Sequence, residues 1–359
     1  MRDELRNTNN FDLLRLLLAS AVVLSHCVSC SGKPALAWLR YITGPPAFGG
    51  PGNVAVEGFF ALSGYLVVAS YERSSAGGYV AKRARRILPA YWAALVFSLL
   101  LGACLSSLPW GSFFRSADTW KFAAANISFL NFLHPSLPGL FTGNPKDNFV
   151  NDPLWTIKVE VMFYVSVPLL VAACRRFGTW QTLAALFFAS LAFRIEVRHL
   201  HMPRVAHQLP GVLSYFLIGT FAWYYRQWFH ANRLLVWLAA GISASGVMLV
   251  KWSPLHAMLQ TIAVPLIVIC FAVLLPHIVS LTRLGDLSYG TYVLHYPVIQ
   301  SLVALGLFNT HPGLAVVTVV VTVGVLAFAS WHLVEVPFLD RPARSASMLA
   351  NHPEFTVTR

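Results

Sequence analysis

Charged residues are scarce in this sequence. Only 11% of its 359 residues are Asp, Glu, Lys or Arg, whereas about a quarter of the residues in a soluble domain are charged. Hydrophobic residues make up 57% of the chain and aromatic residues 13%. Because so few residues favour water, the composition excludes an ordinary soluble protein and favours one that spans a lipid bilayer.

The apolar residues are gathered into continuous runs of about 17 to 22 residues, which is long enough to cross a hydrocarbon core of about 30 Å. Apolar and polar residues do not alternate within the runs, as they would in the strands of a membrane barrel. We therefore predict an all-α, polytopic integral membrane protein with about ten transmembrane helices. The runs lie near residues 11–29, 53–71, 88–108, 154–174, 179–195, 208–226, 233–250, 255–275, 287–307 and 314–334.

Cysteine is also rare, with five scattered residues. Cys27 and Cys30 have CxxC spacing, but no thioredoxin-like pattern of strands and helices surrounds them, so helix packing explains them better than a redox role. No cleavable signal peptide is evident, because the first apolar run is long and Arg15 interrupts it. We expect this run to remain as a helix, and we expect no metal cofactor.

The net charge of +12 could indicate a nucleic-acid partner, but the positions of the basic residues indicate a membrane topology instead. With a cytoplasmic N-terminus, sixteen of the 26 Lys and Arg residues fall on the cytoplasmic side and nine in outside loops, while Lys158 lies within a helix. The bias is clearest in the basic connection 72–87, and only the outer loop 194–207, with three Arg residues, runs against it. We predict that both termini are cytoplasmic.

No Gly/Ser-rich or Pro-rich linker and no repeat of fixed period divides the chain. We predict a single transmembrane domain over residues 1–340 and a short cytoplasmic tail over residues 341–359. The longest interruption, 109–152, contains an apolar stretch at 120–133 that is too short to span the bilayer. We expect this stretch to be an interfacial or re-entrant segment beside an outer loop.

Ionisable residues within the apolar runs are informative, because each costs roughly 2.5–3.5 kcal/mol at a helix centre and usually faces a cavity or a partner. Arg15 and His26 are eleven positions apart, which puts them on one helix face about 16 Å apart along the axis. Glu160 falls at nearly the same depth as His26, and Glu57 also lies just under the outer surface. A carboxylate beside a histidine can fix its tautomer and raise its basicity, as a general base requires.

Each of these residues also has a purely structural interpretation. Glu57 and His26 could extend to the bilayer interface, and Arg15 could be an anchor on the cytoplasmic side. His295, in the ninth run, could line the same cavity or form a hydrogen bond between helices. The basic run 83–86 is typical of a cytoplasmic anchor, yet it is also suited to bind phosphates.

Three segments in the first third of the chain have a recognisable spacing. Arg15 and His26 have ten residues between them, the segment EGFFALSGYLV begins at Glu57, and the segment RARRILPAYW carries Arg83 and Arg86. In this order they resemble the Arg-(ten residues)-His, acidic-x-Phe-Phe-x-x-Ser-Gly and Arg-x-x-Arg elements of the acyltransferase-3 family of membrane acyltransferases. Glu57 stands where Asp is more usual in that family.

Later segments extend the resemblance over nearly the whole chain. LWTIKVEVMFY, with Trp155 and Glu160, resembles the family's Leu-Trp-Ser-x-x-x-Glu-x-x-Phe-Tyr, although Thr156 replaces the common Ser. LSYGTYVLHYPV and HLVEVPF resemble its last two helices, with His295 and Glu335 at the matching polar positions. The fixed order of the elements makes the resemblance far more specific than any one of them.

The resemblance implies an enzyme that transfers an acyl group, most often acetyl, from cytoplasmic acyl-CoA to a hydroxyl of an extracytoplasmic glycan. The acceptor would be an exopolysaccharide, an O-antigen or a lipid-linked precursor. The protein would lie in the bacterial inner membrane, in contact with lipids and with polysaccharide biosynthesis proteins as possible partners, and it would bind no nucleic acid.

Under this interpretation His26 acts as a general base or accepts the acyl group itself, and Glu160 orients it. Arg15, Arg83 and Arg86 would bind the phosphates of acyl-CoA. Further candidates for the lining of the substrate cavity are Glu57, Trp155 and His295.

Three alternatives to this interpretation differ in how well they fit the sequence. A transporter or flippase would also carry intramembrane charges, but it predicts paired halves with broken helices, and no convincing halves are evident. A protein that carries the acyl group across the membrane for a separate partner to attach is harder to distinguish. An unrelated membrane acyltransferase that uses Asn and His fits less well, because its motif positions are not matched.

Overall fold

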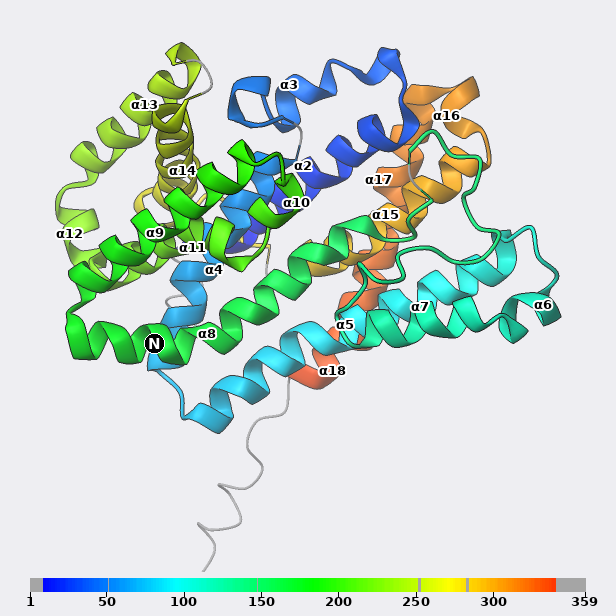
Figure 1. Cartoon of the computed structure of the whole chain (residues 1–359), viewed down its shortest axis with the longest axis horizontal. Coiled ribbons are helices and arrows are strands. Elements are labelled where there is room, and N and C mark those ends of the chain that lie inside the picture. Colours follow the sequence, from blue (N-terminus) through cyan, green and yellow to red (C-terminus); the bar gives the residue numbers. More distant parts are fainter. Residues whose placement is uncertain (1–8, 51, 147, 251–252, 282–283, 340–359) are drawn as a thin grey trace, which may run out of the picture.

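The computed structural model describes residues 9–50, 52–146, 148–250, 253–281 and 284–339, and these ranges contain helices and no strand. Each of the ten apolar runs contains a helix, and the prediction of an all-α polytopic membrane protein is confirmed (Figure 1). Within these described ranges, eight helical segments are long and apolar enough to cross a membrane. They are Phe11–Ser31 (α2), Asn53–Glu72 (α4), Ala76–Leu105 (α5), Asp152–Phe177, Thr179–His199 (α9), Pro203–Tyr224, Pro254–Leu274 and Pro312–Leu339.

Four of these segments are composite. The segment at 152–177 joins a 3₁₀ turn, Asp152–Leu154, to α8 (Trp155–Phe177), and the one at 203–224 joins α10 (Pro203–Ala206) to α11 (Leu209–Tyr224). The last two contain α14 (Pro254–Ile269) with a π-helical turn at Cys270–Leu274, and α17 (Pro312–Ala329) with a π-helical turn at Ser330–Glu335 and α18 (Val336–Leu339). The remaining short elements are 3₁₀ turns at Pro34–Leu36 and Pro46–Phe48, α3 (Leu39–Thr43), α6 (Trp110–Arg115), α7 (Ala117–Ile127), α12 (Arg226–Ala231) and α16 (Leu307–Thr310).

The other two predicted runs form helices of 17 residues, α13 (Arg233–Leu249) and α15 (Ser288–Ala304). Every residue from 288 to 301 is buried, and α15 packs against α2, α5 and α17. Its Tyr, His and Gln side chains are therefore enclosed by other helices and do not face lipid. This enclosed helix is the part of the fold that carries His295.

Helix α5 begins earlier than the sequence predicts. Its first residue is Ala76, and the side chain of Ser75 caps it by accepting a hydrogen bond from the backbone N–H of Gly78 at 3.2 Å. Four of the five basic residues of the predicted connection 72–87 therefore lie on the first turns of a helix and not in a loop. They are Lys82, Arg83, Arg85 and Arg86. Lys and Arg are good helix formers, and a search for apolar runs alone does not detect this extension.

Helix α9 continues beyond the predicted run at 179–195 and ends at His199. Arg194, which the sequence assigned to an outer loop, is instead a helical residue only 1% exposed. One of its N–H groups donates to the backbone carbonyl of Ala257 on α14 at 3.2 Å. The prediction that Arg194 lies in an outer loop is therefore wrong. The hydropathy pattern ends the helix before this charged residue, but the polar contact with α14 stabilises it within the helix.

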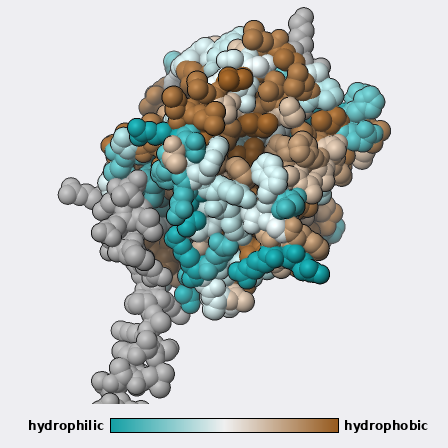
Figure 2. Space-filling model, turned by 90° about the vertical axis from the view of Figure 1, so that its left-hand side faces the viewer, coloured by the Kyte–Doolittle hydropathy of each residue, from teal (hydrophilic) through white to brown (hydrophobic). Residues whose placement is uncertain are grey.

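Large apolar side chains cover outward-facing helix surfaces. Leu169 is 72% exposed, Ile242 70% and Leu333 76%. Figure 2 shows hydrophobic residues over much of the upper part of one face and hydrophilic residues gathered along its lower part. Such exposure of aliphatic side chains is unfavourable in water and favourable in lipid, as expected for membrane-spanning helices.

The long interruption at 109–152 packs on the bundle. The apolar stretch predicted at 120–133 contains most of α7, an 11-residue helix that is too short to span and lies beside α5 (Figure 1). The Tyr91 hydroxyl of α5 donates to the carbonyl of Asn126 at 2.7 Å. Cys27 and Cys30 are buried in α2 and form no disulfide. The predicted tail at 341–359 lies outside the described residues.

Candidate active site

A cavity of about 330 Å³ lies between α2, α4, α5, α8 and α15. Four of the predicted site residues, Arg15, Arg83, Arg86 and Glu160, line it. The cavity extends along α8 from Tyr164, which lies beside Arg83, to Thr156, which is eight residues or about 12 Å away. It is therefore an elongated cavity with basic residues at one end.

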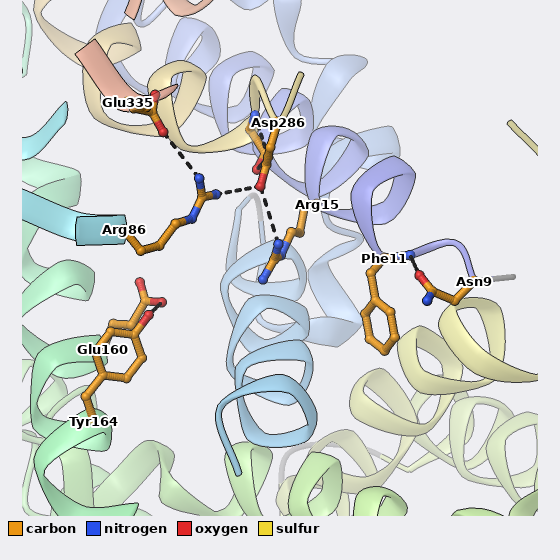
Figure 3. Close-up of polar contacts among 9 residues, drawn as sticks. Asn9, Phe11, Arg15, Arg86, Glu160, Tyr164, Asp286 and Glu335 are labelled. Carbon is orange, nitrogen blue, oxygen red and sulfur yellow. Dashed lines mark hydrogen bonds and ion pairs between the residues drawn. The ribbon is translucent and has the colours of Figure 1, made fainter. Parts of the chain in front are cut away.

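Asp286 joins two of the predicted arginines. Its carboxylate lies 2.6 Å from Arg86 and 3.4 Å from Arg15, and Glu335 approaches Arg86 from the other side at 3.2 Å (Figure 3). Burial alone would raise the pKa of Asp286, but the guanidinium groups of Arg86 and Arg15, with hydrogen bonds from Ser288, lower that pKa below its ordinary value. Arg15 and Arg86 thus already have carboxylate partners.

Asp286 is not among the residues predicted from the sequence. It lies in the connection before α15, outside any apolar run, so the pattern of charges within the apolar runs does not include it. The sequence does contain a signal for it. Asp286 stands directly before the LSYG motif, and two arginines without a predicted partner are expected on the same side of the membrane.

Arg83 differs from the other two arginines. Its guanidinium lies over the ring of Tyr164 at 5.5 Å and donates to the hydroxyl of Ser70 at 3.3 Å. Within the described ranges no carboxylate lies within ion-pair distance of it. Lys82 and Arg85 are exposed neighbours on the same helix that also line the cavity. The unneutralised positive charge of the cavity is therefore concentrated around Arg83.

His26 and His295 form a pair. His295 Nε2 lies 3.0 Å from His26 Nδ1, and His295 Nδ1 lies 2.7 Å from the backbone carbonyl of Tyr292. A carbonyl oxygen only accepts, so His295 Nδ1 carries a proton, and in neutral His295 the other nitrogen is an acceptor. His26 then donates from Nδ1, which leaves the lone pair of neutral His26 on Nε2. His26 is half-buried, whereas His295 is fully buried.

Glu160 contacts a different partner from the one predicted. Its carboxylate accepts a hydrogen bond from the hydroxyl of Tyr164 at 2.5 Å, below Arg86 in the view of Figure 3. The predicted contact between Glu160 and His26 is not among the hydrogen bonds of the described residues. The partner of the His26 ring is His295, from a helix 269 positions further along the chain.

A hydrogen bond in the wall of the cavity lies next to the histidine pair. The hydroxyls of Thr156 and Tyr292 lie 2.7 Å apart, both side chains are buried, and both residues line the cavity. The carbonyl of the same Tyr292 binds His295. Thr156 and Tyr292 thus line the cavity next to the histidine pair, and neither His26 nor His295 is among its lining residues.

The remaining predicted residues lie elsewhere. Glu57 and Trp155 line a second, smaller pocket, where Glu57 accepts hydrogen bonds from the Tyr215 hydroxyl at 2.7 Å and from Gln260 at 2.9 Å. Trp155 stacks on His207, with ring centroids 5.3 Å apart. In the described part of the chain no three or more His, Cys, Asp or Glu side chains form a group that could hold a metal ion.

Comparisons with known proteins agree with the motifs. The chain is 31% identical to nodulation protein 10 of Rhizobium leguminosarum bv. viciae, over 92% of both chains. It is 28% identical to an O-acetyl transferase of Shigella phage Sf6, over 96% of this chain and 100% of the phage protein. No solved structure matches significantly. A family model described as an acyltransferase domain matches residues 8–333, so this membrane protein belongs to the acyltransferase-3 family.

Proposed function

We propose that this acyltransferase transfers an acetyl group from cytoplasmic acetyl-CoA to a hydroxyl of an extracytoplasmic glycan, in the bacterial inner membrane. The observation that carries the proposal is the elongated cavity, which has basic residues at one end and ends near the histidine pair at the other. The phage relative, named as an O-acetyl transferase, supports acetyl as the group transferred.

The donor fits this cavity by charge and by length. The phosphates of CoA would bind at Arg83, with Lys82 and Arg85 beside it, because these cations line the cavity and none of them forms an ion pair in the described ranges. The pantetheine arm would extend along α8 toward Thr156, and the carboxylate of Glu160 could accept a hydrogen bond from one of its amides. Arg15 and His26, about 16 Å apart on α2, mark the two ends of this path.

The reaction requires the acetyl group to pass the contact between Thr156 and Tyr292. His26 Nε2 would then remove the proton from the acceptor hydroxyl as its oxygen attacks the thioester carbonyl. The tetrahedral intermediate collapses with cleavage of the C–S bond, and the CoA sulfur leaves with the proton that His26 returns. The products are the acetyl ester and CoA. His295 is a positioning residue in this scheme, because it acts through His26.

A covalent route uses the same atoms in two steps. His26 Nε2 attacks the thioester carbonyl, the C–S bond breaks and CoA leaves as the thiolate. The acceptor oxygen then attacks the acyl-imidazolium and takes the acetyl group as the C–N bond breaks, and the hydroxyl proton is released to balance the CoA thiolate, so that the net products are the acetyl ester and the CoA thiol. Purified protein mixed with acetyl-CoA in the absence of acceptor distinguishes the two routes. Detection of acetylated His26 by mass spectrometry supports the covalent route, and its absence under conditions of full donor binding supports direct transfer.

The proposed function is tested by mass spectrometry of surface glycans from a deletion strain complemented with wild type, His26→Ala or His311→Ala. His311 is an exposed histidine that lines neither the elongated cavity nor the smaller pocket beside Glu57, and it serves as the control. We expect wild type and His311→Ala to restore acetylation and His26→Ala to lose it by at least about 10²-fold. Full acetylation with His26→Ala would overturn the mechanism. Identical glycans in the deletion and wild-type strains would overturn the assignment of a glycan acceptor.

Membrane topology is part of the proposal. The N- and C-termini and the basic end of the cavity would be cytoplasmic, which matches the location of acetyl-CoA, and polysaccharide biosynthesis proteins would supply the acceptor. Cysteine accessibility on intact cells tests this orientation, with single cysteines introduced at the exposed positions Arg85 and His311 in a variant that lacks native cysteines. We expect an impermeant reagent to label position 311 and not position 85.

A further inference from the structure

The smaller pocket that contains Glu57 and Trp155 lies next to the elongated cavity proposed to bind acetyl-CoA, which we call the donor cavity. Its volume is about 20 Å³, and it is lined by polar and aromatic side chains from α4, α8, α9, α11 and the connection before α11. Val56 and Phe60 line both the pocket and the cavity, so they form the wall between them. The polar and aromatic residues that matter for its chemistry are Glu57, Trp155, Arg194, Arg198, His207 and Tyr215.

Arg194 is a buried cation with unused hydrogen-bonding capacity. It is 1% exposed, and its guanidinium lies over the ring of Tyr215 at 4.7 Å. Its Nη2 group donates to the carbonyl of Ala257 and to the hydroxyl of Thr261. Its Nε and Nη1 groups have no partner among the described residues. Unpaired buried donors of a charged group are costly, which indicates that a ligand or a water molecule satisfies them.

Glu57 presents the complementary group. It is 7% exposed, and its Oε1 atom accepts from both Tyr215 and Gln260, whereas Oε2 has no partner in the described part of the chain. No ion pair among the described residues joins Glu57 to Arg194. The lining of the pocket therefore includes an unused acceptor, on Glu57, and unused donors, on Arg194.

The chemistry of the pocket selects one kind of ligand. An anion would be repelled by Glu57 and a cation by Arg194 and Arg198, whereas a hydroxyl both donates and accepts. The volume is sufficient for one group of about the size of a water molecule. The stacked rings of Trp155 and His207, inclined by 16°, provide an apolar wall of the kind that a sugar ring packs against.

We propose that this pocket binds one hydroxyl of the acceptor sugar, which donates to Glu57 Oε2 and accepts from Arg194. The bound hydroxyl is a neighbour of the one that is acetylated, so the pocket would determine which sugar is accepted and how it is oriented. This inference rests on the proposed function, because it assigns a site to the acceptor of that reaction.

The test uses purified protein, acetyl-CoA and the glycan fragment whose acetylation is lost in the deletion strain. The fragment is compared with its monodeoxy analogues, each lacking one hydroxyl other than the acetylated one. For wild type we expect one analogue to show a kcat/KM at least tenfold below that of the parent fragment. Glu57→Gln is expected to lower the kcat/KM of the parent at least tenfold and to reduce the ratio of parent to analogue to less than threefold.

Two further variants make the result specific. Arg194→Lys keeps the charge but loses the Nε and Nη1 donors, so it should also reduce the ratio of parent to analogue. This variant serves as the test if Glu57→Gln does not fold. His311→Ala is the matched control, because His311 is exposed and does not line the pocket, and it should keep the wild-type ratio of parent to analogue. The KM for acetyl-CoA should change less than twofold in all three variants, because the pocket is separate from the donor cavity.

The outcomes separate this proposal from the proposed function. Unchanged discrimination in Glu57→Gln and Arg194→Lys, with acetyl transfer still occurring, overturns the hydroxyl site and indicates a buried water in the pocket. If Glu57→Gln and Arg194→Lys lose turnover to the same degree for the parent fragment and for every analogue, the two residues have a structural role. That result also overturns the hydroxyl site. If wild type consumes no acetyl-CoA in the presence of the fragment, the proposed function itself fails.

Discussion

His295 Nε2 accepts the Nδ1 proton of His26 across 3.0 Å, and the carbonyl of Tyr292 fixes the tautomer of His295 from its other side. This chain of hydrogen bonds presents the lone pair of His26 on Nε2, the nitrogen that general-base catalysis would use. The position that a carboxylate often occupies beside a catalytic histidine is thus held by a second, neutral histidine.

The first prediction concerns His295. Replacement by Leu removes the acceptor for His26 Nδ1, so the tautomer is no longer fixed and kcat should fall by about 10² to 10⁴-fold, with little change in the KM for acetyl-CoA. His295→Gln can place an amide oxygen near the lost nitrogen and should recover part of the activity. Steady-state kinetics on purified protein measures both constants. Equal losses with Leu and Gln, or a parallel rise in KM, would contradict a positioning role.

The second prediction concerns Arg83. Its guanidinium has no carboxylate partner in the described ranges, so we expect it to bind donor phosphates. Arg83→Ala should raise the KM for acetyl-CoA about tenfold, which corresponds to about 1.4 kcal/mol. The same variant should leave the KM for acetyl-pantetheine, which lacks the nucleotide phosphates, within twofold of wild type. An equal effect on the two donors would assign Arg83 to the pantetheine path instead.

The third prediction concerns the stability that Asp286 contributes. Its pKa is lowered in the folded protein, so its charged form stabilises the fold above the unfolded-state pKa of about 3.9. That contribution is lost as the pH falls through the lower native pKa. Asp286→Asn should therefore lower the thermal unfolding temperature at pH 7. The difference between wild type and variant should shrink as the pH falls below about 4.

Thermal unfolding in detergent micelles between about pH 3 and pH 7 measures this difference. Asp118→Asn is a suitable control, because Asp118 forms an exposed pair with Lys121 at 3.0 Å, and such pairs contribute little. A difference between wild type and Asp286→Asn that stays constant over the whole pH range would show that the Asp286 charge is not the source of the stability.

The helices and their polar positions could be predicted because both depend on local sequence. A continuous apolar run of sufficient length has few alternatives to a membrane helix, and the spacing of Arg15 and His26 fixes their common face. The residues at which the helices begin and end were harder to predict. Helix α5 starts at Ala76 because the Ser75 side chain caps it, and α9 continues past Arg194 because that residue donates a hydrogen bond to α14. A hydropathy pattern contains neither of these contacts.

The partners of the site residues could not be predicted from local pattern. Glu160 and His26 were matched by depth alone, but depth does not determine which helices are adjacent. The structure places α15 against α2, which brings His295 to His26. Asp286 lies between Arg15 and Arg86 only because the connection before α15 passes this end of the bundle. These contacts join residues at least 200 positions apart and follow from helix packing.

The fourth prediction concerns the contact between α4 and α11, which positions Glu57 and Tyr215. The two helices approach so closely that a Cβ atom at Gly64 would lie 1.9 Å from the backbone carbonyl oxygen of Phe216. A Cβ atom at Gly219 would lie 1.9 Å from the carbonyl oxygen of Ala61. Small residues permit this approach in membrane helix pairs, and backbone atoms cannot move aside as a flexible side chain can.

Gly64→Ala should therefore force the helices apart and destabilise the fold by about 1–3 kcal/mol or more. It should also lengthen the hydrogen bond between Tyr215 and Glu57, so the acceptor KM should rise in any protein that still folds. Gly241→Ala on α13 is the matched control, because a Cβ atom there meets nothing within 4 Å and Ala is the better helix former. Thermal unfolding of both variants in detergent tests this, and equal stability of the two would contradict the close packing of α4 on α11.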